Sequence, residues 1–107
     1  MSFECNLNKG FSMTFENGFR ISVQWGTMNY CHRKEFAEFG IEQKQDHWES
    51  ATAEIAVFDP DGGMISITEI DTVAGWLTTD QVAKVITIVS SATSNKEVVE
   101  KVKSLNL

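Results

Sequence analysis

Residues 11–25 read FSMTFENGFRISVQW, and apolar side chains occupy every second position on both sides of the central ENG. This alternation is typical of half-buried β-strands. A two-residue turn would place the apolar sets of the two strands on opposite faces, which a one-sided core cannot accept. A loop of three residues, 16–18, restores one common face, with Gly18 in the left-handed conformation. The stretch therefore predicts a hairpin with the pairs Phe15–Phe19, Met13–Ile21 and Phe11–Val23.

A second hairpin is predicted over residues 53–68, where apolar and polar side chains again alternate. The turn between its strands reads DPDGG at 59–63, in which proline, aspartate and glycine suit successive turn positions. This turn places Val57 opposite Ile65 and Ile55 opposite Ile67. A fifth strand is expected over 71–77, with a bulge or a close backbone approach at Gly75.

The period then changes to that of a helix over residues 79–92, and Thr78-x-x-Gln81 has the form of a capping box. The β-branched run 85–89 leaves a strand open as the alternative. Ser94-x-x-Glu97 repeats the capping pattern before a second helix. Strands first and helices last predict an α+β fold: a twisted antiparallel sheet of about five strands, two β-hairpins plus one strand, covered by two C-terminal helices.

Length and composition indicate one soluble domain spanning residues 1–107, because 107 residues with 42% hydrophobic content support a single core. The net charge of −6 disfavours direct binding to nucleic acid, whose phosphates attract basic surfaces. No apolar run is long enough to span a membrane, and the N-terminus has no secretion signal. Cys5 and Cys31 are expected to be free thiols in a reducing cytoplasm, with Cys5 outside the sheet.

The segment 26–50 follows neither periodicity and is interpreted as a long irregular insertion. Loops of this length are uncommon unless they are functional or disordered. Its aromatic content argues for order, because disordered segments are normally poor in aromatic residues. The segment is therefore a candidate for the functional part of the chain.

Aromatic rings, an arginine and amide or imidazole groups gather in and beside the insertion, a combination that suits a planar anionic ligand such as a nucleotide. The candidate ligand-binding residues are Trp25, Asn29, Tyr30, His32, Arg33, His47 and Trp48. The structural alternative is that the rings at 25, 30 and 48 complete the edge of the core while Arg33 pairs with Glu35 or Glu38.

The sequence gives weaker support to a metal site or a catalytic thiol. Cys5, Cys31, His32 and His47 are zinc-ligand types, but their spacing fits no closed zinc site, so neither a metal nor another cofactor is expected. A thiol nucleophile at Cys31 would need a histidine base within reach, and no catalytic motif is present. The protein is therefore not expected to be an enzyme. Acidic residues recur through the insertion and could imitate nucleic-acid phosphates: Glu35, Glu38, Glu42, Asp46 and Glu49.

The stretches 15–26, 29–31 and 53–57 resemble a group of small bacteriophage-encoded proteins of uncharacterised function. This resemblance implies a phage origin and the cytoplasm of a host cell, and it transfers no site residues. Small phage domains of this kind often act by stoichiometric binding, which is an analogy and not a physical derivation.

These observations favour a non-catalytic counter-defence protein that sequesters a small nucleotide-type ligand. The first alternative is an acidic inhibitor that blocks a host defence protein by nucleic-acid mimicry. The second is a small thiol- or metal-dependent enzyme. A homo-oligomer is expected, because an exposed strand edge or an apolar surface favours self-association and a shared pocket would help so short a chain to enclose a ligand.

Overall fold

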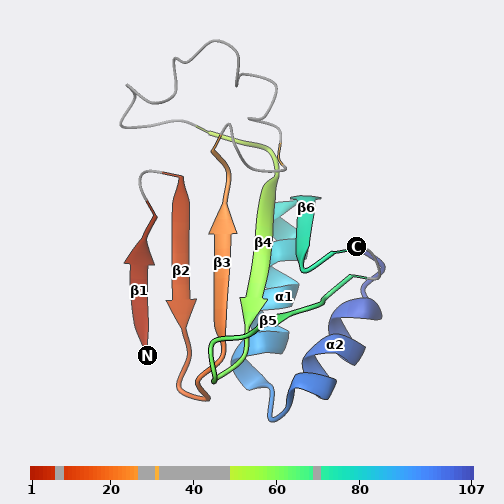
Figure 1. The fold of residues 1–107 in the computed structure, drawn as a ribbon. Helices are drawn as coiled ribbons and strands as arrows, with labels where there is room; N and C mark the ends of the chain where they lie inside the picture. Colours follow the sequence, from red (N-terminus) through yellow and green to blue (C-terminus); the bar gives the residue numbers. More distant parts are fainter. Residues whose placement is uncertain (7–8, 27–30, 32–48, 69–70) are drawn as a thin grey trace.

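The computed structural model describes residues 1–6, 9–26, 31, 49–68 and 71–107. Six strands precede two helices (Figure 1). They are β1 (Ser2–Cys5), β2 (Gly10–Thr14), β3 (Arg20–Gln24), β4 (Ala53–Phe58), β5 (Met64–Ile65), β6 (Val73–Leu77), α1 (Thr79–Ser91) and α2 (Asn95–Lys103). The strands form one antiparallel sheet in the order β1-β2-β3-β4-β5, and β6 also pairs with β4. The predicted α+β fold is confirmed.

The first hairpin has the predicted register. Met13 lies opposite Ile21 and Phe11 opposite Val23. The Phe15 N–H donates to the carbonyl oxygen of Phe19 at 2.8 Å, which leaves three residues in the loop. Gly18 has a φ of 89°, the left-handed conformation that this loop requires.

The second hairpin is only partly as predicted. Its turn is confirmed, with Val57 opposite Ile65 and Gly62 at a φ of 90°. The pairing of Ile55 with Ile67 is wrong, because β5 ends at Ile65 and Ile55 lies opposite Ala74 of β6. Two short strands therefore share one edge of β4. Ile67 is nevertheless buried in the core.

The irregularity expected near Gly75 is present in β6. Leu77 lies opposite Ala53 and Ala74 opposite Ile55, so two residues of β6 stand against one residue of β4. This is a β-bulge. Trp76, inside it, has a positive φ of 53° and a side chain that is 56% exposed. The bulge lets both Ala74 and Leu77 face the core.

Strand β1 was not predicted, and the expectation that Cys5 lies outside the sheet is wrong. Cys5 pairs with Phe11, and Phe3 pairs with Met13. The apolar residues at positions 1, 3 and 5 alternate as in a strand, but the stretch is too short for its periodicity to stand out. All of β1 is exposed.

Both helices begin as predicted, and the run 85–89 is helical. The Thr78 side chain accepts from the Gln81 N–H while the Gln81 side chain accepts from the Thr78 N–H, which completes the capping box. At α2, Ser94 accepts from the Glu97 N–H at 3.1 Å. The two helices start from satisfied backbone groups, which fixes where the chain turns away from the sheet.

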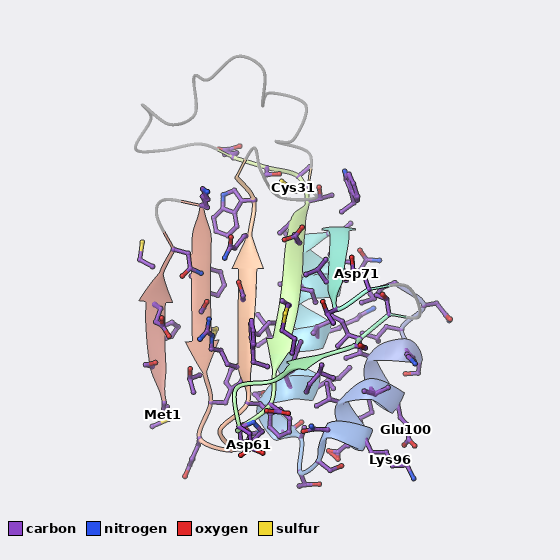
Figure 2. All side chains as sticks on the ribbon, in the orientation of Figure 1. Met1, Cys31, Asp61, Asp71, Lys96 and Glu100 are labelled. Atoms are coloured by element: carbon purple, nitrogen blue, oxygen red, sulfur yellow. The ribbon has the colours of Figure 1, made fainter. Side chains whose placement is uncertain are left out.

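The core lies between the helices and one face of the sheet. Helix α1 packs on β3 and β4, and α2 packs on α1 (Figure 1). Fully buried positions include Ile21, Ile55, Val57, Val85, Val89 and Val98. Strands β1 and β2 lie beyond the helices on the other side of the molecule. Figure 2 shows Met1 on that side and Lys96 and Glu100 of α2 on the far side.

The hairpin turns hold the helices at one end of the sheet. The Asn17 side-chain amide donates to the carbonyl oxygens of Val89 and Ala92, each at 2.9 Å, at the end of α1. Asp59 accepts from the Gly63 N–H at 2.9 Å and from the Asn95 side chain at 3.1 Å, and these hydrogen bonds lower the pKa of its carboxyl group. Turn residues therefore position both helices.

Across the described residues, no helix has the length and apolar character needed to cross a membrane.

Candidate functional site

A pocket of about 320 Å³ lies at the opposite end of the sheet from the hairpin turns. It lies where β3 ends, β4 begins and α1 starts. Its lining comes from these elements and also from β2 and β6: Phe11, Val23, Trp25, Ser50, Ala51, Thr52, Ala53, Leu77, Thr79, Val82, Ala83 and Ile86. The pocket is therefore a product of the tertiary fold.

Trp25 is the largest side chain in this lining and is half-buried. Its backbone N–H donates to the carbonyl oxygen of Lys9 at 2.7 Å, which fixes the chain where it leaves β3. Its ring meets Phe11 edge-on, with centroids 6.2 Å apart and an interplanar angle of 70°. This geometry is favourable for two aromatic rings. Trp25 thus completes the core edge and also lines the pocket.

Besides the indole of Trp25, the polar side chains in the lining are hydroxyls. The Ser50 hydroxyl donates to the carbonyl oxygen of Thr52 at 2.6 Å, just before β4 begins. Thr52 is half-buried and Thr79 is exposed at the start of α1. No charged side chain is among the described residues that line the pocket. The walls therefore suit an uncharged planar group with a few hydrogen-bonding atoms.

Of the residues predicted to bind a ligand, the structure places Trp25. The other six lie outside the described residues: Asn29, Tyr30, His32, Arg33, His47 and Trp48. The acidic residues proposed for mimicry also lie outside them, apart from the exposed Glu49. The interpretation of these residues stays a prediction.

The two cysteines are free thiols, as predicted, and their environments differ. Cys31 is fully buried, and its thiol donates to the carbonyl oxygen of Gly26 at 3.5 Å. Figure 2 shows Cys31 near the start of β4. A buried thiol satisfied by a carbonyl group has the environment of a packing residue. Over the residues the structure describes, no three histidine, cysteine or acidic residues cluster as metal ligands.

Sequence reasoning missed most of the pocket. Thr79, Ala83 and Ile86 lie on the helix that the sequence predicts, but nothing in the linear order indicates that its first turns approach Trp25. The signal that could have been used is local: Trp25 precedes the insertion and Ser50 ends it, so the pairing of β3 with β4 brings them to the same end of the sheet.

Comparisons of the chain with protein-family models, curated proteins and solved structures found no match.

Proposed function

We propose that this protein is a non-catalytic binding protein that holds the planar ring of a small ligand in the Trp25 pocket. The observation that carries the proposal is the lining itself: a tryptophan that is half-buried, aliphatic walls and hydroxyl groups around about 320 Å³. Small-molecule sites are typically concave and mostly apolar, with a few polar groups that orient the ligand. The volume suits a ring system of nucleobase size.

A nucleotide is the ligand class that this proposal favours. A base offers a flat face to an aromatic side chain, and base–aromatic stacking contributes about 1–3 kcal/mol. Hydroxyl groups such as that of Thr79 can accept or donate to the edge of the base. Arg33 and the two histidines of the sequence are proposed to contact the anionic part of the ligand, because they are the cationic and imidazole groups of the predicted binding segment.

The same lining supports the proposal of binding without chemistry. Neither a titratable side chain nor a thiol is among the described residues at the pocket. Together with the phage resemblance, this supports sequestration of a nucleotide signal, with a counter-defence role as the biological setting. That setting rests on analogy, whereas the pocket rests on its residues.

The test is calorimetry and thermal unfolding with a panel of linear and cyclic nucleotides. A ligand present at 100 times its dissociation constant stabilises the folded state by about 2.7 kcal/mol when it binds only that state. Bound ligand should be recovered intact after the complex is denatured. Absence of any shift across the panel, or recovery of a converted ligand, would contradict the proposal.

Two variants locate the binding. Ala83 is exposed and lines the pocket, so Ala83→Phe should fill it without removing a core contact. Ser90→Phe is the matched control, because Ser90 lies two turns further along α1, is also exposed and does not line the pocket. We expect Ala83→Phe to weaken binding at least about 10-fold, equivalent to about 1.4 kcal/mol, and Ser90→Phe to leave it unchanged. Equal affinities of the two variants would place the ligand elsewhere.

A further inference from the structure

Within the described part of the chain, β1 pairs only with β2, and its outer edge carries two exposed apolar side chains. Met1 is 89% exposed and Phe3 is 80% exposed. Phe3 lies opposite Met13, which in turn lies opposite the core residue Ile21. Opposed residues of an antiparallel pair point to the same face, so Phe3 is on the face that the helices cover elsewhere. The helices do not bury it because they pack on β3 and β4 (Figure 1).

One hydrogen bond shows which residues of β1 direct their backbone groups outward. The Asn6 N–H donates to the carbonyl oxygen of Gly10 at 3.0 Å, so the backbone of Asn6 is directed at β2. Along an antiparallel strand, the backbone N–H and C=O groups of successive residues point alternately to one edge of the strand and to the other. Ser2 and Glu4 therefore also direct their backbone groups at β2, whereas those of Phe3 and Cys5 point outward. An outward row of this kind is a template for another strand.

We propose that β1 pairs antiparallel with β1 of a second copy of this chain, with Phe3 on the two-fold axis. Two copies related by an axis perpendicular to the sheet keep the same face of each sheet on the same side. This arrangement places Phe3 opposite its own symmetry mate and Met1 opposite Cys5, so the apolar residues continue across the junction. Both contacts use the outward backbone groups.

Charge favours this register over the one that is shifted by one residue. With Phe3 on the axis, Glu4 lies opposite Ser2 of the other copy. With Glu4 on the axis, two carboxylates would lie directly opposite each other, which is destabilising for a cross-strand pair. The strand holds no lysine and no proline, which are common protections against edge pairing. The edge is therefore self-complementary.

The size of the junction determines its strength. A buried phenylalanine accounts for about 150–250 Å², so two copies of Phe3 with Met1, Cys5 and the strand edges stay within the range of roughly 1,200 Å² or less that is typical of transient interfaces. We therefore expect a reversible dimer that dissociates on dilution. This inference is independent of the Trp25 pocket, which lies on other strands.

Sedimentation over protein concentrations from about 10 µM to 1 mM tests the association. The wild-type mass should rise toward that of two chains. Phe3→Glu should remain monomeric with an unchanged melting temperature, because the side chain is exposed and the new carboxylates meet on the axis. Met64→Glu, at a 47% exposed residue of β5, is the matched control and should associate like wild type. A wild type that stays monomeric, or a Phe3→Glu variant that associates equally, would overturn the proposal.

Cross-linking tests the register. In the double variant Phe3→Cys, Cys5→Ser, the thiols at position 3 should form an intermolecular disulfide under mild oxidation, because opposed Cα atoms lie about 5.5 Å apart in a hydrogen-bonded pair. Wild-type Cys5 is exposed on the same strand but lies opposite Met1, so its dimer should not cross-link. Cross-linking through wild-type Cys5, or none through position 3, would reject this register, and strand addition by a foreign peptide would then be the remaining use of the edge.

Discussion

Asn17→Asp should destabilise the protein far more than its nearly identical shape suggests. The Asn17 amide donates to the carbonyl oxygens of Val89 and Ala92, and its own oxygen accepts from the Phe19 N–H at 3.1 Å. Aspartate keeps the acceptor for Phe19 but replaces the donor with a second oxygen. That oxygen would face two carbonyl oxygens at the negative end of the α1 dipole.

The expected loss of stability is the sum of two contributions. Two lost hydrogen bonds cost about 0.5–1.5 kcal/mol each. A negative charge at a helix C-terminus adds about 0.3–1 kcal/mol. The free energy of unfolding should therefore fall by about 1.3–4 kcal/mol, which corresponds to a decrease in melting temperature on the order of 5–20 °C for a domain of this size.

The assay is thermal and urea unfolding of wild type and Asn17→Asp at about pH 7 and about pH 4, near the ordinary pKa of aspartate. Protonation gives the new carboxyl group a donor and removes its charge, so its pKa in the folded state should be raised. Stability that depends on this proton is present at low pH and is lost as the pH rises. The stability difference between wild type and Asn17→Asp should therefore be larger at about pH 7 than at about pH 4. A difference below about 2 °C at neutral pH, or one that does not change with pH, would refute the role assigned to Asn17.

Two further predictions concern Gly10 and Asp59. Gly10→Ala would drive its Cβ into the carbonyl oxygen of Val23 on β3, so the ladder must open, and urea unfolding should show a loss of at least about 2 kcal/mol. Gly62→Ala meets no atom within 4 Å and carries only the strain of an alanine at a φ of 90°, so a loss at Gly10 no larger than the loss at Gly62 would contradict this. Hydrogen bonds from the Gly63 N–H and the Asn95 side chain lower the pKa of the Asp59 carboxyl group, so its contribution to stability is full above the ordinary pKa of 3.8 and is lost as the pH falls through the folded value. Asp59→Asn should therefore be less stable than wild type at neutral pH, and its melting temperature should approach that of wild type in acid. A difference in melting temperature that stays constant across this pH range would argue against the assignment.

The parts of the fold that could be predicted are those fixed by short-range rules. Alternation and a three-residue loop determine the register of the first hairpin, and a hydroxyl residue three positions before Gln81 or Glu97 determines a helix start. The run 85–89 shows the same rule at work, since capping and helical spacing prevail there over β-branched composition.

The parts that could not be predicted depend on which elements meet. Ile55 and Ile67 satisfy every local condition for a pair, yet β6 occupies that section of the β4 edge. No sequence rule at either residue decides between two candidate strands for one edge. The pocket has the same origin, because Trp25 and Ile86 are brought together only when α1 packs across the sheet.

The pairing of β3 with β4 has a consequence for how this protein can vary in length. Gln24 and Glu54 are neighbours in the sheet although they are 30 positions apart in the chain. The entropy lost when two strands are joined rises only with the logarithm of the length between them, so doubling that length costs about 0.6 kcal/mol. A change of length between these strands should therefore cost the fold little, provided that Trp25 and the buried Cys31 keep their packing. This connection is therefore the place where a lineage, or an engineer, can change the length of the chain while the scaffold persists.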